Sequence, residues 1–193
     1  MIRVFYAQKK LVKNFSGSAA YSYSQVWYRD PRPGHSGEWY PGDFDFRNAF
    51  TLTAGYKFEL LNRPGYARLH SKPWFPFVSF IFPAGDRNEI SAKFRVLGGR
   101  PYTKPDTLTG NRIWGTSTSA PLNGSRYPAY NSLDLRWERR YGFGFLQMIY
   151  YFEVQNIYGR ENVWQYLFVD GNTQKSTVYQ LPFFPSGGLI IGF

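Results

Sequence analysis

The stretch SLDLRWERRY at residues 132–141 alternates apolar and ionic side chains one for one. Leu133 and Leu135 fall on one parity, while Asp134 and Arg136 fall on the other. Successive side chains of a β-strand point to opposite faces of the sheet. This stretch therefore predicts a strand with one apolar face and one ionic face.

The same period of two recurs along the chain. It predicts main strands at residues 2–8, 15–29, 50–58, 89–96, 132–141, 146–154 and 186–193, and an extra hairpin from residues 163–169 and 176–181. The composition agrees, since the chain has 18 Phe, 16 Tyr and 6 Trp but only 2 Met, and aromatic residues favour strands and membrane interfaces. We expect an all-β antiparallel meander of about seven to nine strands, as one domain over residues 1–193.

The connections between these strands alternate in length. Long polar links at residues 30–45, 99–128 and 158–185 fall at one end of the predicted sheet, and the tight turn after residue 140 falls at the other. Transmembrane barrels show this asymmetry, with short turns inside and long loops outside. The exception is residues 59–87, an aromatic segment on the short-turn side, which we expect to lie at the inner membrane interface and to be helical before Pro83.

The direction of the apolar face separates a soluble sandwich from a membrane barrel. Strands of nine residues or more, aromatic residues near strand ends and an aromatic C-terminus favour a transmembrane barrel, because sandwich strands average about five or six residues. The ionic face would then line the lumen, with Lys57, Lys93, Arg95, Asp134, Arg136, Glu138, Arg140 and Glu153. Pairing among these charges is the favoured interpretation, and an Arg136–Arg140 clamp for an anionic ligand is the alternative.

The composition excludes several chemistries. With no Cys, the chain has no disulfide, thiol nucleophile or iron–sulfur ligand. Its two histidines, His35 and His70, both lie in connections, so we expect no metal site, no cofactor, no catalytic residue and no enzyme activity. The formal charge of +10 suits an anionic partner, but the basic residues are spread along the strands, which favours lipid and lipopolysaccharide over nucleic acid.

Five stretches in order carry a family resemblance. They are FTLTAGYKF at 50–58, ISAKFRVLGGRPYTKP at 90–105, RYPAYNSLDLRWERRYGF at 126–143, YFEVQNIYGRENVWQYLF at 151–168 and VYQLPFFPSGGLIIGF at 178–193. Together they resemble the final strands of TonB-dependent outer-membrane receptors. The resemblance implies a Gram-negative outer-membrane barrel of about 22 strands around a plug domain, which imports a bulky nutrient of the siderophore or glycan class.

Against that family, this chain would supply only a C-terminal part of the barrel. The expected partners are the missing barrel strands and plug, TonB through the plug alone, and the barrel-assembly machinery. The resemblance assigns the assembly signal to Leu189, Ile191 and the terminal Phe193, so deletion of Phe193 is expected to leave the chain in the periplasm. The alternative is a small self-closed outer-membrane barrel with a structural or adhesive role.

Overall fold

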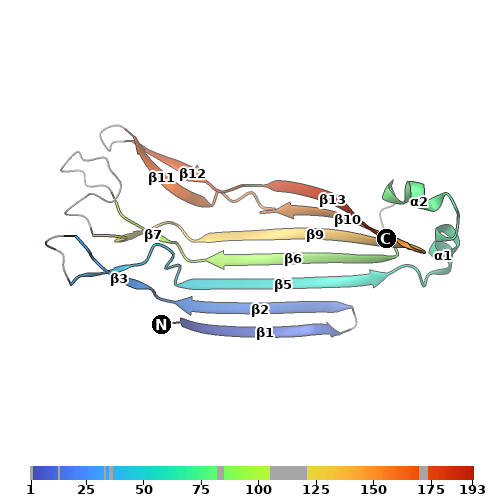
Figure 1. The fold of residues 1–193 in the computed structure, drawn as a ribbon, viewed down its shortest axis with the longest axis horizontal. Coiled ribbons are helices and arrows are strands. Elements are labelled where there is room, and N and C mark those ends of the chain that lie inside the picture. Colours follow the sequence, from blue (N-terminus) through green and yellow to red (C-terminus); the bar gives the residue numbers. More distant parts are fainter. Residues whose placement is uncertain are drawn as a thin grey trace.

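The protein is built on one antiparallel sheet of seven strands (Figure 1). The computed structural model describes residues 2–12, 14–32, 34, 37–81, 85–104, 121–169 and 174–193. The strands lie in the order β1 (Ile2–Val12), β2 (Phe15–Ser24), β5 (Asn48–Glu59), β6 (Arg87–Leu97), β9 (Tyr130–Phe143), β10 (Leu146–Gln155) and β13 (Phe184–Gly192). Every neighbouring pair is antiparallel, so the predicted all-β meander is confirmed.

The two ends of the sheet carry different structures. One end, the long-loop end, carries three two-stranded hairpins: β3 (Trp27–Arg29) with β4 (Trp39–Pro41), β7 (Pro101–Tyr102) with β8 (Ser125–Arg126), and β11 (Val163–Val169) with β12 (Gln174–Tyr179) (Figure 1). The other, the short-turn end, carries α1 (Pro64–His70), α2 (Phe75–Val78) and the 3₁₀ turn η1 (Ser79–Ile81). The predicted asymmetry of the connections and the predicted extra hairpin are therefore confirmed.

The predicted strand at residues 15–29 is wrong in one respect, because the chain bends and starts a new strand within it. β2 ends at Ser24, and Trp27 begins β3, which pairs with β4 outside the main sheet. The bend is held by a contact that alternation cannot reveal: the backbone N–H of Val26 donates to the carboxylate of Asp45 at 3.4 Å. Asp45 is fully buried at this bend.

Within residues 59–87 the chain is helical in three short stretches before Pro83, in agreement with the prediction, and the placement of this segment at a membrane interface stays a prediction. Two short helices and η1 fold against the end of β9, and Phe75 is completely buried among other rings. An isolated interfacial helix would have exposed this ring to lipid. Phe82 and Pro83 lie outside the described residues, as do the tip of the β11–β12 hairpin at residues 170–173 and residues 105–120.

At several positions in the middle of the sheet, polar side chains are more buried than apolar ones, which is the reverse of burial in a soluble sandwich. On the polar parity of β9, Ser132 and Asp134 are buried, with Asp134 8% exposed. On the apolar parity, Ile90 is 51% exposed and Leu52 is also exposed. Among the described residues, the few buried apolar side chains gather mainly near the two ends of the sheet, as Phe75, Tyr127, Tyr141, Val154 and Tyr166. No second layer of described residues covers the apolar face in the middle of the sheet.

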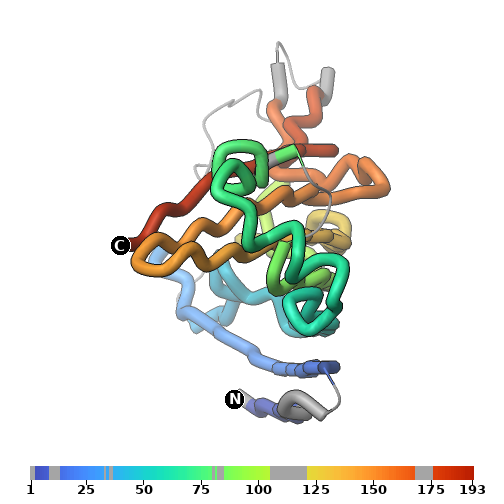
Figure 2. The backbone as a smooth tube through the Cα atoms, turned by 90° about the vertical axis from the view of Figure 1, so that its right-hand side faces the viewer, coloured from blue at the N-terminus to red at the C-terminus, as the bar shows by residue number. Residues whose placement is uncertain are grey.

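The sheet is open. In the part of the chain that the structure describes, β1 pairs only with β2 and β13 pairs only with β10. Figure 2, which looks along the strands, shows β1 in blue and β13 in red lying apart. The described strands therefore do not form the self-closed barrel that the alternative interpretation requires.

Candidate functional site

All eight predicted lumen residues lie on one face of the main sheet, which we call the ionic face. Cross-strand partners share a face, and the register pairs Lys93 with Asp134 and Arg136 with Glu153. It also pairs Lys57 with Glu89, which stands opposite Glu138. The strict alternation along β5, β6, β9 and β10 explains this, because the charged residues of each strand are spaced by two and the register aligns their face with the charged face of the next strand.

Ion pairs link most of the ionic face. Glu138 accepts from Arg136 at 3.0 Å and from Arg140 at 2.6 Å, and Arg136 also reaches Glu153 at 3.2 Å. Elsewhere on the face, Arg95 binds Asp134 at 2.8 Å and Lys57 binds Glu89 at 3.3 Å. Arg136 and Arg140 therefore meet on a carboxylate of this chain, which is the geometry of mutually neutralised charges rather than of an open anion clamp.

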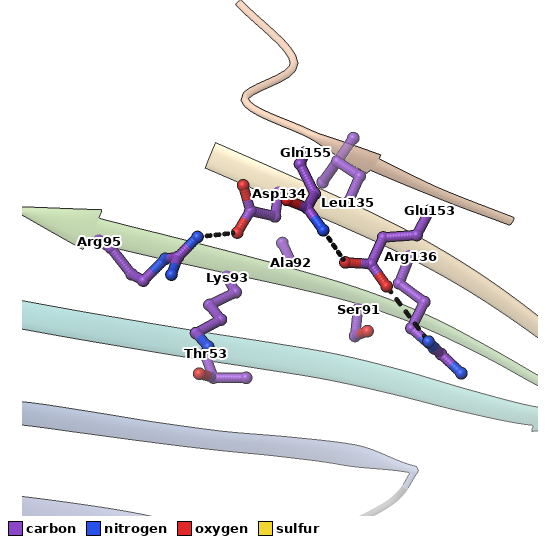
Figure 3. A pocket seen from close by; sticks show the side chains of 10 residues that line it. All are labelled: Thr53, Ser91, Ala92, Lys93, Arg95, Asp134, Leu135, Arg136, Glu153 and Gln155. Carbon is purple, nitrogen blue, oxygen red and sulfur yellow. Dashed lines mark hydrogen bonds and ion pairs between the residues drawn. The ribbon is translucent and has the colours of Figure 1, made fainter. Parts of the chain in front are cut away.

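A hollow of about 390 Å³ lies on the ionic face between these pairs (Figure 3). Its lining is formed by Thr53, Ser91, Ala92, Lys93, Arg95, Asp134, Leu135, Arg136, Glu153 and Gln155. Lys93 is the exception to the pairing, since it is exposed and makes no ion pair with any residue that the structure describes. The hollow thus combines hydroxyl and amide groups with the ammonium group of Lys93, whose charge no described residue neutralises. This combination suits a polar or anionic group of a solute.

A second group of residues, which sequence reasoning did not single out, lies at the long-loop end. The rings of Tyr102, Tyr127 and Tyr166 cluster there, with centroids 4.4 Å apart for the first pair and 5.1 Å for the second. Arg100 lies over Tyr127 at 5.0 Å and over Trp164 at 4.7 Å, and it donates to the carbonyl of Trp164. We call these five residues the loop-end cluster.

The loop-end cluster borders two further hollows, of about 280 Å³ and 370 Å³. Both include Arg100 and Tyr127, and the larger also contains Asn123 and Gln165. Burial raises the pKa of Tyr102, with Tyr166 and Tyr127 adding to the effect, so its hydroxyl stays protonated and can donate. Aromatic faces beside amide and hydroxyl groups can hold a solute with mixed polarity.

Two glycines allow the loops to approach the sheet at this end. A side chain at Gly98 would collide with the carbonyl of Phe46, and one at Gly99 would collide with the carbonyl of Tyr127. Arg126, which precedes Tyr127 in the sequence, donates to the carbonyl oxygen of Gly99 at 2.9 Å and to the carboxylate of Asp45 at 2.5 Å. The Gly-Gly pair predicts a break in the strand, but the neighbours that require it come from distant segments.

The predicted assembly signal lies on edge strand β13. Leu189 pairs with Tyr150 and Ile191 with Met148, so both share the apolar face, and both are about half exposed. Phe193 follows the last strand residue and is fully exposed. Its role in assembly stays a prediction.

The described residues contain no group of three or more His, Cys, Asp or Glu side chains placed to hold a metal ion. His70 stacks on Phe143, with 5.1 Å between ring centroids, and its Nε2 lies 3.2 Å from a carboxylate oxygen of Asp86 without forming a hydrogen bond. His35 lies outside the described part of the chain. None of the helices that are described has both the length and the hydropathy to cross a membrane.

Comparisons with protein-family models, with curated proteins and with solved structures find no match for this chain. The family resemblance therefore depends on the five sequence stretches alone.

Proposed function

We propose that this chain is a wall segment of a TonB-dependent receptor in the outer membrane of a Gram-negative bacterium. In this proposal the apolar face contacts lipid, the ionic face lines the lumen, and the loops at the long-loop end contribute to the capture of a bulky nutrient of the siderophore or glycan class. The segment itself carries out no chemistry.

The observation that carries the proposal is the inverted burial of the two faces. Exposed apolar surface costs about 25 cal/mol per Å² in water, so a folded chain with Leu52, Ile90 and Phe152 exposed on one face is poorly suited to an aqueous surface. Hydrocarbon removes that cost. Six of the seven main strands have 10 to 14 residues and β13 has 9, and a tilted strand needs about 9 to 11 to cross a bilayer.

The open edges favour the interpretation of the chain as part of a larger barrel wall over its interpretation as a small closed barrel. β1 and β13 each present one row of backbone groups without a partner among the described strands. In hydrocarbon, each unsatisfied backbone group costs several kcal/mol. Additional strands, as in a receptor barrel, would satisfy both rows.

The features of the long-loop end support capture of a solute. Three hairpins project there, and the loop-end cluster presents rings beside an arginine. The ionic hollow with Lys93 lies on the lumen side of the same wall. A solute that passes along this face would meet polar groups whose charges are almost balanced.

A pair of adjacent positions tests the orientation of the two faces. Because the chain has no Cys, Ser91→Cys and Ala92→Cys each give one labelling site on β6, the first on the ionic face and the second on the apolar face. We would express each variant in Gram-negative cells, attach a nitroxide to the outer-membrane fraction, and compare its relaxation by oxygen and by a water-soluble nickel complex. We expect oxygen to dominate at position 92 and the nickel complex at position 91.

Reversed accessibility of the two positions in the membrane-inserted chain would overturn the proposal. The matched control is the second adjacent pair, Thr53→Cys on the ionic face and Ala54→Cys on the apolar face of β5, which must give the same contrast.

A further inference from the structure

The segment at residues 60–81, between β5 and β6, carries basic residues but no acidic ones, and the pairing of the strands does not require this charge. It contains Arg63, Arg68 and Lys72 and no Asp or Glu. All three cationic side chains are exposed, and none makes an ion pair with a described residue. We call residues 60–81 the cationic cap. Its charge suits an anionic partner at the short-turn end.

Buried rings fix the cationic cap to the sheet. Phe75 is 0% exposed and contacts Tyr141 and Phe143 of β9, each with a centroid separation of 6.2 Å. The hydroxyl of Tyr141 donates to the carbonyl of Ser79 at 2.9 Å. The cap is therefore a packed element with a defined position.

A buried carboxylate provides a second attachment. Asp86, just before β6, accepts from the hydroxyl of Tyr66 at 2.9 Å and from the backbone N–H of Gly142 at 2.7 Å. Tyr66 belongs to α1 and Gly142 to the end of β9. The same side chain thus connects the cap to the sheet.

The cationic cap is attached on the side of the apolar face. Tyr141 and Phe143 have the same parity as Leu133 and Leu135, because side chains on one strand alternate between faces. In Figure 1 the cap lies at the strand ends of the short-turn end, with α2 beside the end of β9. If the apolar face contacts hydrocarbon, the cap stands at the level where hydrocarbon gives way to headgroups.

The position of Arg139 provides a second indication of the depth at which hydrocarbon gives way to headgroups. Arg139 belongs to the apolar parity of β9, and its guanidinium lies over the rings of Trp137 at 5.1 Å and Tyr150 at 5.4 Å. A cation on a lipid-facing strand is tolerated near a headgroup layer, where aromatic rings also gather. Arg139 is two residues from Tyr141, the attachment point of the cap.

The cationic cap leaves apolar side chains uncovered beside its cations. Phe77 is 80% exposed and Ile81 is 66% exposed, and Trp74 and Leu61 are also exposed. Cations interspersed with exposed aromatic and aliphatic side chains are typical of elements that lie in the interface of an anionic bilayer.

We propose that the cationic cap docks on the anionic phospholipid headgroups of the leaflet at the short-turn end. This inference rests on the proposed function, because it requires the apolar face to contact lipid. Phe77 and Ile81 enter the interface, Arg63, Arg68 and Lys72 bind phosphate groups, and the Phe75 cluster holds these side chains in place.

The test measures the depth of the cap with a fluorescent label at Phe77→Cys in the full chain. The labelled chain is reconstituted in vesicles of phosphatidylcholine, with or without about one third phosphatidylglycerol, that contain lipids with a nitroxide near the headgroup. We expect strong quenching in the anionic vesicles and clearly weaker quenching in the neutral ones. The triple variant Arg63→Gln, Arg68→Gln, Lys72→Gln is expected to lose the difference between the two vesicles.

Three controls make each outcome decisive. A matched triple variant at exposed basic residues elsewhere in the chain, Arg3→Gln, Arg29→Gln and Lys104→Gln, must retain the difference between vesicles. A label at Ala92→Cys, with a nitroxide deep in the acyl chains, reports insertion of the wall itself. A label at Ser71→Cys, between two of the cap's cations, reports headgroup contact without altering an exposed ring.

Quenching at position 92 without quenching at positions 71 and 77 in either vesicle would overturn the docking and leave the wall segment standing. That result would assign the exposed cap to a protein partner. Equal quenching at position 77 in both vesicles would overturn the anionic selectivity. In the inserted chain, weaker quenching by the deep nitroxide at Ala92→Cys than at Ser91→Cys would overturn the proposed function, and this inference would fall with it.

Discussion

The two ends of the sheet hold their connections in opposite ways. At the long-loop end, fully or nearly buried polar groups tie the hairpins to the strands: Asp45 binds Arg126, and Asn162 bonds both backbone groups of Asn131. At the short-turn end, rings gather around Phe75, and the polar contacts are secondary. The first end relies more on directional bonds, alongside the rings of the loop-end cluster, and the second relies more on apolar burial, alongside the hydrogen bonds of Asp86.

This difference follows from the kind of segment that each end attaches to the sheet, which is a long loop at one end and a short helical segment at the other. Long loops with little regular structure must satisfy their backbone groups through side chains, and left-handed residues such as Asn123 and Asn156 do so where the chain reverses. In the short helical segment, local turns pair some backbone groups, such as the N–H of Ala67 with the carbonyl of Arg63 and the N–H of Phe75 with that of Lys72, and burial of Phe75 fixes the segment to the sheet. A single change at each end should therefore produce effects of different kinds.

The largest effect is expected from Phe75→Ala at the short-turn end. Removing a fully buried ring costs about 3–5 kcal/mol, and here the loss should be confined to the cationic cap and the adjoining end of β9. Hydrogen–deuterium exchange of the chain in detergent should show faster exchange at residues 64–81 and unchanged exchange in the β3–β4 hairpin. Phe77→Ala, at a ring 80% exposed, is the control and should change little.

A smaller, opposite-end effect is expected from Asp45→Asn. The change keeps the size of the side chain but removes the charge that binds Arg126, and hydrogen bonds to charged groups contribute about 1.5–3 kcal/mol. Exchange should rise in β3, β4 and β8 and stay unchanged in the cationic cap. The matched control is Asp43→Asn, because an exposed amide oxygen there can still accept from Asn123. Loosening of both ends by Asp45→Asn would contradict the independence of the two regions.

The smallest effect is a pH dependence at the short-turn end. Burial, together with the hydrogen bond to Asp86, raises the pKa of Tyr66 above its ordinary value of 10.0. The folded cap therefore favours the protonated phenol: this contribution to stability is complete below about pH 10 and declines as the pH rises beyond it.

The near-ultraviolet circular dichroism of the aromatic cluster should accordingly weaken as the pH rises above about 10. The variant Tyr66→Phe should weaken less over the same interval, because the group that titrates is gone. An identical profile for both proteins would show that Tyr66 does not control this end.

Much of the sheet could be predicted from the sequence, because alternation is a local property. Leu133 and Asp134 differ in parity whatever surrounds them, so the seven main strands and the shared face of the eight charged residues followed from spacing alone. The bend after Ser24 and the buried position of Phe75 did not, because each depends on a residue far away in the sequence. Asp45 fixes the first, and Tyr141 with Phe143 fixes the second.

The loop-end cluster shows the same limit at the candidate site. Arg100, Tyr127 and Trp164 look in sequence like scattered loop residues, and only the folded chain brings them together. Their sole local signal was an arginine directly after Gly98 and Gly99, at the end of a predicted strand.

The sequence by itself determined the period of two and the shared face of the eight charged strand residues, because these depend only on the alternation of side chains along a strand, and it also determined the unequal lengths of the connections. The tertiary structure decided how exposed the side chains of each face are, that the described sheet stays open, and how each end is held. Those properties depend on the curvature of the sheet and on contacts between distant residues, which spacing along the chain does not encode.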